Sequence, residues 1–173
     1  MTGKEFLRAV SNGRTDILEV LLDILREARA SYCVIGGLSV NAYAEPVVSL
    51  DCDLVVVAKD LAKVRRAAMA KGMRVREFEH SVNLSLPDSD LRIQLQTDGR
   101  YQEFIPRASR RTVLGYKMTV AALDDVLRGK IWAYSDESRR RSKRQKDLAD
   151  ILRLIETHPR LKDRLPPGLV KAL

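Results

Sequence analysis

The sequence lacks any apolar run close to the ~20 residues that a transmembrane helix needs. Its first residues, MTGKEFLRAVSNGR, also lack the apolar core of a secretion signal. We therefore expect a cytoplasmic protein with no membrane partner. Cysteine is scarce as well: Cys33 and Cys52 both lie in predicted buried strands, where we expect them to pack as small apolar side chains. Nothing in the sequence requires a disulfide between them.

Internal repeats and linkers are absent too. The chain has 173 residues, of which 45% are hydrophobic and 31% are charged, so it is long enough to bury an apolar core and too apolar to be disordered. We expect one domain over residues 1–173. Within it we predict an α/β core of the α+β type over about residues 15–118 and a C-terminal helical subregion over about residues 119–173.

Positive charge is in excess, with a formal net charge of +8, which favours association with polyanions. Residues 138–147, SRRRSKRQKD, gather six of the basic side chains in one block. Such a block is typical either of a solvated helix surface or of a surface that faces the phosphates of a nucleotide or RNA. The sequence leaves both interpretations open.

Two features between residues 32 and 57 point to chemistry. Gly36-Gly37 separates an apolar strand (residues 32–35) from a short helix (residues 38–44), where glycine lets a backbone approach a ligand closely. Asp51 and Asp53 are two apart on a second strand (residues 49–58), so both side chains leave on one face. Neighbouring carboxylates repel, and a divalent cation is the usual solution. The intervening helix would bring both features to one end of adjacent strands.

The rest of the chain alternates between helical and extended patterns. Helices are predicted from residue 15 to residue 28, from residue 61 to about residue 70, from residue 120 onward and over about residues 137–157. Strands are predicted at residues 73–78, 82–86, 91–96 and 113–118, with residues 87–90 as a hairpin turn. In the strand of residues 91–96 a polar row, Arg92, Gln94 and Gln96, faces away from the apolar side chains.

A glycine pair that opens a helix, followed by Asp-x-Asp, suits metal-dependent transfer of a nucleotidyl group. In VIGGLSVNAYA (residues 34–44), LDCDLVVV (residues 50–57), the lysine of GKIWAY (residues 129–134) and R-x-K-D-x-x-D (residues 144–150), the sequence resembles the minimal nucleotidyltransferase superfamily. The branch that it resembles includes the abortive-infection type IV toxin nucleotidyltransferases. The resemblance implies a nucleotidyltransferase-like mixed β-sheet flanked by helices.

The resemblance also implies roles for individual residues. Gly36, Gly37 and Ser39 would contact the triphosphate, and Asp51 and Asp53 would bind Mg²⁺ or Mn²⁺. The residues that would reach or border the same cleft from the C-terminal helices are Lys130, Arg144, Lys146 and Asp147.

Structural roles are the alternative for the C-terminal residues. Lys130 then faces solvent from a helix surface. Asp147 and Asp150 then pair along their helix with Arg144 or Arg153.

The sequence departs from the family pattern in two places. The third carboxylate of the metal site falls on Gln94, and an amide ligates a metal weakly and cannot take a proton. Asp98 could replace it in another register, and Asp90 less readily. Shortly before Asp51, where many relatives carry a basic residue, this sequence has Val47-Val48-Ser49.

Three functions are therefore considered. The first is a magnesium-dependent nucleotidyltransferase that moves a nucleoside monophosphate from a nucleoside triphosphate (NTP) to an acceptor hydroxyl on RNA or protein, as a toxin or defence component with a cognate antitoxin. The second is a catalytically degenerate member of the same fold that binds a nucleotide or RNA. The third is a protein-interaction role within a toxin-antitoxin pair.

Overall fold

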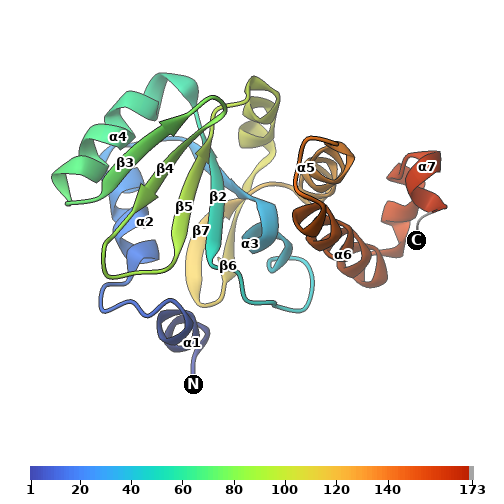
Figure 1. The fold of residues 1–173 in the computed structure, drawn as a ribbon, viewed down its shortest axis with the longest axis horizontal. Helices are drawn as coiled ribbons and strands as arrows, with labels where there is room; N and C mark the ends of the chain where they lie inside the picture. Colours follow the sequence, from blue (N-terminus) through green and yellow to red (C-terminus); the bar gives the residue numbers. More distant parts are fainter. Residues whose placement is uncertain (172–173) are drawn as a thin grey trace.

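The computed structural model describes residues 1–171 and contains a mixed seven-stranded sheet (Figure 1). The strand order is β3-β4-β5-β2-β1-β7-β6. The strands are β1 (Tyr32–Ile35), β2 (Asp51–Val56), β3 (Arg74–Phe78), β4 (Ser81–Ser85), β5 (Arg92–Gln96), β6 (Ser109–Val113) and β7 (Tyr116–Val120). Strand β2 runs parallel to β5 and antiparallel to β1, which is parallel to β7. The predicted α+β class with a mixed sheet is confirmed.

Helices cover both faces of this sheet (Figure 1). The α-helices are α1 (Gly3–Val10), α2 (Ile17–Glu27), α3 (Gly36–Val40), α4 (Leu61–Ala70), α5 (Leu123–Ser135), α6 (Arg141–Thr157) and α7 (Pro167–Val170). The 3-10 helices are η1 (Ala58–Asp60), η2 (Gly99–Arg107) and η3 (Pro159–Arg164). Helices α2 and α4 pack on one face, while η2, α5 and α6 pack on the other. No helix of residues 1–171 is long and apolar enough to cross a membrane.

Two apolar clusters lie on opposite faces of the sheet, because alternate residues of each strand point to opposite faces. In β2, Cys52, Leu54 and Val56 join the cluster under α2 and α4. Val55 joins the cluster under η2, α5 and α6. Asp51 and Asp53 share the face of Val55, so they lie where this second cluster opens to solvent.

The predicted roles of the two cysteines are confirmed. Cys33 and Cys52 are free and buried, and they belong to different clusters on opposite faces of the sheet. Burial raises the pKa of both thiols, to about 12 for Cys33. They therefore act as apolar packing groups.

Some predicted boundaries were wrong. The short helix expected at residues 38–44 instead runs from Gly36 to Val40 as α3. The strand expected at residues 113–118 spans a turn, because Leu114 (φ 50°) and Gly115 (φ 86°) adopt left-handed conformations that join β6 to β7 as a hairpin. The last long helix begins at Arg141 rather than near residue 137. Asp136 is extended, and its carboxylate accepts hydrogen bonds from the Ser138 amide and hydroxyl, which fixes a turn between α5 and α6.

Candidate active site

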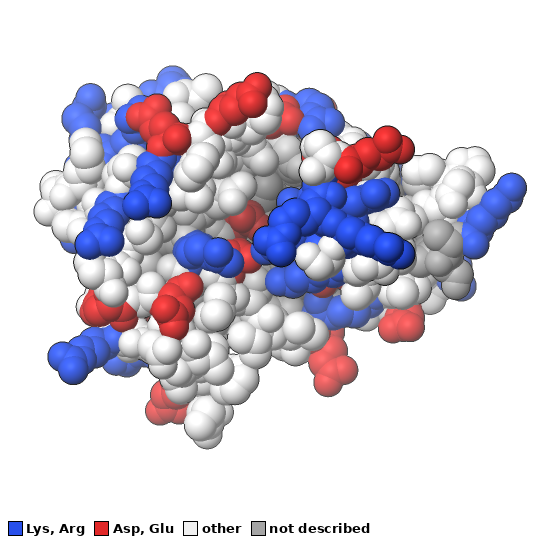
Figure 2. All heavy atoms as spheres, viewed as in Figure 1, with Lys and Arg blue, Asp and Glu red and all other residues white. Residues whose placement is uncertain are grey.

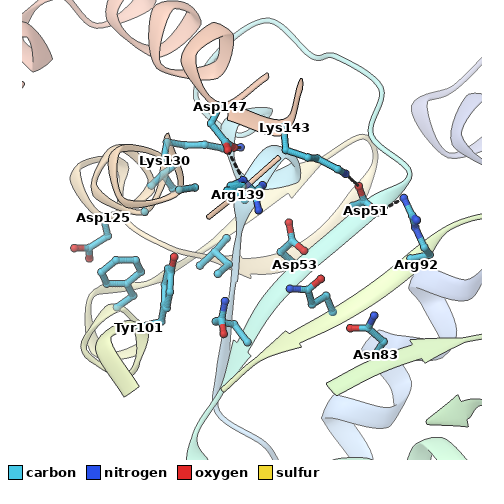
Figure 3. Close-up of a pocket in the computed structure, with 18 residues that line it drawn as sticks. Asp51, Asp53, Asn83, Arg92, Tyr101, Asp125, Lys130, Arg139, Lys143 and Asp147 are labelled. Atoms are coloured by element: carbon cyan, nitrogen blue, oxygen red, sulfur yellow. Dashed lines mark hydrogen bonds and ion pairs between the residues drawn. The ribbon is translucent and has the colours of Figure 1, made fainter. Parts of the chain in front are cut away.

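A cleft of about 270 Å³ lies between the sheet and the C-terminal helices (Figure 3). Its walls come from β1, β2, β4, β5, η2, α5, α6 and the turn before α6. The polar and glycine residues that line it are Gly36, Asp51, Asp53, Asn83, Arg92, Gln94, Gln96, Tyr101, Asp125, Gly129, Lys130, Arg139, Lys143 and Asp147. Figure 2 shows basic side chains on both sides of this hollow, with acidic atoms between them.

Asp51 lies at the edge of the cleft and is held by two cations. Its Oδ1 lies 2.8 Å from Nη2 of Arg92, its neighbour in register on β5, and its Oδ2 lies 3.3 Å from Nζ of Lys143 on α6 (Figure 3). Both basic side chains are substantially exposed, and exposed ion pairs are worth less than about 1 kcal/mol. An incoming cation can therefore replace them at small cost.

Asp53 lies deeper, near the centre of β2. Burial and, to a smaller extent, the neighbouring Asp51 charge raise its pKa to about 6, although Lys130 acts in the opposite direction. Its side chain is only partly accessible to solvent, through the cleft. Among residues 1–171 it forms no direct ion pair like those of Asp51. The charge of this carboxylate is therefore incompletely compensated, as expected of a side chain at a cation-binding site.

Gly36 brings backbone directly against Asp53. Ile35 pairs with Asp53 across β1 and β2, and the next residue, Gly36, has φ +69° at the start of α3. A Cβ atom at Gly36 would collide with the Asp53 carboxylate. Glycine is required here both for the backbone conformation and for the close approach.

Gln94 occupies the place beside the two acids. The register pairs Asp53 with Gln94 and Gln94 with Asn83, which gives a row of three polar side chains across β2, β5 and β4 (Figure 3). Asp98 instead pairs with Arg100 at the start of η2 and lies outside the cleft. Asp90 accepts a hydrogen bond from Asn12, also outside the cleft. The third polar position of the row is therefore an amide.

Lys130 borders the cleft from α5, but its ammonium group is already paired. The side chain is 7% exposed, and Nζ lies 3.0 Å from Oδ1 of Asp147 and 2.6 Å from Oδ2 of Asp150. Asp147 also accepts a 2.8 Å hydrogen bond from Nε of Arg139. Asp150 pairs with Arg153 at 2.8 Å, as the sequence alternative allowed. Lys130 thus connects α5 to α6 and, through Asp147, orients Arg139 toward the cleft.

The other predicted site residues lie around the cleft rather than in its lining. Ser39 is buried, and its hydroxyl donates to the Gly36 carbonyl at 2.7 Å. Gly37 lies behind Gly36, facing Ser49 and Asp150.

Two residues of α6 also lie outside the lining. Nε of Arg144 donates to the Tyr134 carbonyl at 2.7 Å, and Lys146 is exposed. The basic residues that line the cleft from this region are Arg139 and Lys143.

The sequence analysis did not identify several of the residues that line the cleft. Asn83 carries a signal, because it lies between the apolar residues Val82 and Leu84 and so must face the same side as the polar row of β5. Lys143 lies four residues before Asp147 and thus on the same helix face. Asp125 carries no such signal; it is 2% exposed and clamped by Arg107 through two 2.8 Å hydrogen bonds.

The chemistry of the donors fits a metal ion that arrives with its ligand. Residues 1–171 contain no group of three His, Cys, Asp or Glu side chains placed to hold a metal ion. Mg²⁺ at nucleotide sites is commonly held by one or two carboxylates, with phosphates and waters as its other ligands. Asp51, Asp53 and the Gln94 amide provide oxygen donors on one wall of the cleft. Because the pKa of Asp53 is raised, a cation bound there would stabilise its charged form.

Solved structures with a similar fold include enzymes that adenylylate antibiotics. The antibiotic-resistance factor ANT(2'')-Ia, in complex with adenylyl-2''-tobramycin, has a TM-score of 0.64 at 14% identity, over 90% of this chain and 94% of that chain. The lincosamide antibiotic adenylyltransferase LnuA, bound to lincomycin, has a TM-score of 0.58 at 12% identity, over 82% of this chain and 98% of that chain. The chain has the nucleotidyltransferase fold.

A third protein with the nucleotidyltransferase fold extends this likeness to a eukaryote. A nucleotidyltransferase-like antigenic protein of Paracoccidioides brasiliensis has a TM-score of 0.54 at 18% identity, over 96% of this chain and 92% of that chain. No protein-family model and no curated protein sequence matches this chain. The likeness therefore shows the fold, and the chemistry must be argued from the cleft.

Proposed function

We propose that the protein is a magnesium-dependent nucleotidyltransferase that binds an NTP in the cleft and transfers its nucleoside monophosphate to a hydroxyl group. One observation carries the proposal: Asp51 and Asp53 face the same cleft beside the Gly36 turn, and Asp53 has no direct counter-ion among residues 1–171. A neighbouring acid pair with one uncompensated member weakens a fold and is expected where a divalent cation binds.

Basic residues on both sides of the acid pair would receive the phosphates. Arg92, Arg139 and Lys143 line the cleft from β5, from the turn before α6 and from α6. Asp51 and Asp53 would hold Mg²⁺, and Arg92 and Lys143, released from Asp51, would then be available to phosphate oxygens. Bound Mg²⁺ would supply neutralisation of the phosphate charge and alignment of the reacting oxygens. Gly36, Gly37 and Ser39 would shape the turn on which the triphosphate rests.

The C-terminal residues that the family resemblance placed at the cleft then divide into two groups. Lys130 and Asp147 would act at the cleft by holding Arg139 and by setting the local charge. Arg144 and Lys146 would meet the acceptor outside it, since both lie beyond the lining.

The transfer forms a bond between the acceptor oxygen and the α-phosphorus, breaks the bond between the α-phosphorus and the bridging oxygen, and releases pyrophosphate. The hydroxyl must also lose a proton, which passes to a water molecule of the solvent in the cleft. Gln94 can orient that hydroxyl by a hydrogen bond but cannot take its proton. We therefore expect slower transfer than a carboxylate at this position would give.

Gln94 also favours a second candidate, which is binding of a nucleotide or RNA without transfer. The amide lies beside Asp53 in the row where a base would act. In this case the protein binds Mg²⁺ and NTP and releases the NTP unchanged.

The acceptor that we propose is RNA, because Arg139, Arg140 and Arg141 are exposed beside the cleft and would attract phosphates. A protein hydroxyl is the alternative. A cytoplasmic toxin or defence role with a cognate antitoxin stays a prediction. Two proteins of the same fold were solved with antibiotic or adenylyl-antibiotic ligands, so tobramycin and lincomycin belong among the acceptors to be tested.

The deciding experiment incubates the protein with each α-³²P-labelled NTP, Mg²⁺ and cell RNA, cell protein or antibiotic. We expect label to pass to RNA, and we expect Asp51→Asn and Asp53→Asn to abolish the transfer. Calorimetric titration with the same NTP separates the two candidates, because binding without any transfer supports the second. If neither binding nor transfer occurs, both candidates fail. Growth after expression of the wild type and Asp51→Asn tests the toxin role.

A further inference from the structure

A second hollow of about 540 Å³ adjoins the cleft beyond the end of β5. The two share Gln96, Tyr101, Ala133 and Arg139 as a common wall. A ligand with phosphates in the cleft could thus extend into the second hollow. None of the roles assigned above uses this space.

The floor of the second hollow is a stack of flat groups. Trp132 of α5 lies parallel to Phe104 of η2, with ring centroids 5.5 Å apart and an interplanar angle of 17°. On Trp132 lies the Arg100 guanidinium group, with Cζ 4.8 Å from the ring centroid. Tyr101 packs edge-on against both rings. The Arg100 guanidinium group therefore lies over this aromatic cluster.

Arg100 is fixed in this position. Its Nε and Nη2 lie 2.9 Å and 2.7 Å from the Asp98 carboxylate, which also accepts a 3.0 Å hydrogen bond from the Arg100 backbone amide. The side chain nevertheless remains 59% exposed. Arg100 also lines the second hollow, so a ligand there can contact its guanidinium group. Guanidinium groups attract and stack on flat π systems.

The carboxylates and guanidinium groups that line the second hollow balance one another. Asp98 pairs with Arg100, and the wall also carries Asp136 and Arg139. Gln96 offers a donor: its amide oxygen accepts from the backbone of Thr97 and Asp98, which leaves its NH₂ group for a ligand. A neutral flat group with hydrogen-bonding edges matches this combination.

We propose that the second hollow binds a nucleobase stacked on Arg100, with the base edge toward Gln96 and Asp136. The inference rests on the proposed function, which puts phosphates in the adjoining cleft, and adds where a base is held. Two sources share this chemistry: the base of the incoming NTP and the terminal base of an RNA acceptor. Aromatic and guanidinium planes commonly hold bases in this way.

Trp132 is the only tryptophan of the chain, so its fluorescence reports on this stack alone. The titrations contain Mg²⁺ and are corrected for absorption with N-acetyltryptophanamide. We expect a ligand that has a base to quench Trp132 saturably, whereas inorganic tripolyphosphate binds without quenching. Quenching by ATP or another NTP assigns the base to the substrate. Quenching only by a short oligoribonucleotide, with tripolyphosphate present, assigns it to the acceptor.

Two substitutions separate stacking from charge. Arg100→Gln removes the charged plane, and Arg100→Lys keeps the charge but removes the plane. Both should weaken binding of the quenching ligand roughly tenfold, within the range that loss of a stacking group costs, and leave tripolyphosphate binding unchanged. The matched control is Arg26→Gln on α2, whose arginine pairs with Asp23 and lines neither space. It should bind every ligand as the wild type does.

The outcomes distinguish this inference from the proposed function. If calorimetry detects NTP binding that Asp51→Asn abolishes, while Trp132 is not quenched and both Arg100 variants bind normally, the base site is wrong and the proposed function stands. If Arg100→Lys binds normally while Arg100→Gln does not, charge rather than stacking is responsible, and the base site is again wrong. If no NTP and no RNA binds in calorimetry, both proposals fail together.

Discussion

Two pairs of aspartates, one on β2 and one on α6, lie on opposite sides of one cleft and have opposite surroundings. Asp147 and Asp150 on α6 are almost fully buried, and each has two direct basic partners, Lys130 together with Arg139 or Arg153. On β2, the two exposed cations Arg92 and Lys143 both contact Asp51. Asp53 has no direct partner among residues 1–171, and its pKa is raised to about 6, chiefly by burial.

The difference indicates two uses of the same side chain. The α6 pair is part of a closed ion network that joins α5, α6 and the loop after α3, since Arg153 also donates to Asn41. Its charges are satisfied permanently, as buried charges must be. The β2 pair is left partly unsatisfied, which costs stability and is explained by a cation that binds only with its ligand.

Breaking the closed network should have the largest effect on stability. Lys130→Met preserves side-chain volume but leaves Asp147 and Asp150 buried with one cation fewer. We expect the free energy of unfolding to fall by about 3–5 kcal/mol, as it does when one partner of a buried ion pair is removed. Urea denaturation measures the change. The control is Lys146→Met, an exposed lysine of α6, which should change stability by less than about 0.5 kcal/mol. Equal stability of the two variants would show that the network is not structural.

A third carboxylate beside the β2 pair should make the open site more active. Gln94→Glu introduces an acid in register with Asp53, and a positioned general base commonly contributes about 10²-fold or more. We expect the Mg²⁺-dependent transfer of label to RNA to rise by about that factor. The control is Gln145→Glu at an exposed position of α6 outside the cleft lining, which should give no gain. A rate that is unchanged or lower in Gln94→Glu would mean that the amide itself is the functional group.

The glycine turn beside Asp53 offers a smaller test. Gly36→Ala must adopt a left-handed conformation and places a methyl group against the Asp53 carboxylate. We expect a loss of at least about 1–2 kcal/mol from the conformation alone. At Gly37 the nearest side-chain atom to an added Cβ would be Oγ of Ser49 at 3.6 Å, an ordinary contact, so Gly37→Ala should be close to neutral. Thermal unfolding of the two variants compares them. A similar cost at both positions would contradict the requirement for glycine at Gly36.

Much of the open site was predictable from the sequence, because strand periodicity is local. Alternation put Asp51 and Asp53 on one face of β2 and the polar row with Gln94 on one face of β5, and the parallel pairing of β2 with β5 brings the two rows together. The closed network was not predictable, because its contacts join different helices. The sequence offered Arg144 or Arg153 as partners of the α6 acids, and only Arg153 is one.

The start of α6 was also beyond local reasoning. Asp136 and Ser138 form a turn that shifts the helix start to Arg141. This turn and the orientation of α6 decide which members of the basic block line the cleft, and they are Arg139 and Lys143.

The central claim is that the β2 pair costs stability until a cation binds, and Asp53→Asn tests it most directly. The ordinary pKa of an aspartate, 3.8, is raised to about 6 in the fold, so the charged form destabilises the protein above pH 6. This cost is relieved as the pH falls through about 6 toward 3.8. With chelator at pH 8, Asp53→Asn should therefore be more stable than the wild type, by about 1–2 kcal/mol after allowance for the partial exposure of the site.

The same variant should lose what the wild type gains from its ligand. Saturating Mg²⁺ with a non-hydrolysable NTP should raise the melting temperature of the wild type and leave that of Asp53→Asn almost unchanged. Thermal unfolding of both proteins at pH 8, with chelator and with ligand, gives the four values required. We predict that Asp53→Asn is the more stable protein in chelator and that the wild type is the more stable protein with the ligand. A variant that is less stable in chelator, or that gains as much from the ligand as the wild type does, would contradict it.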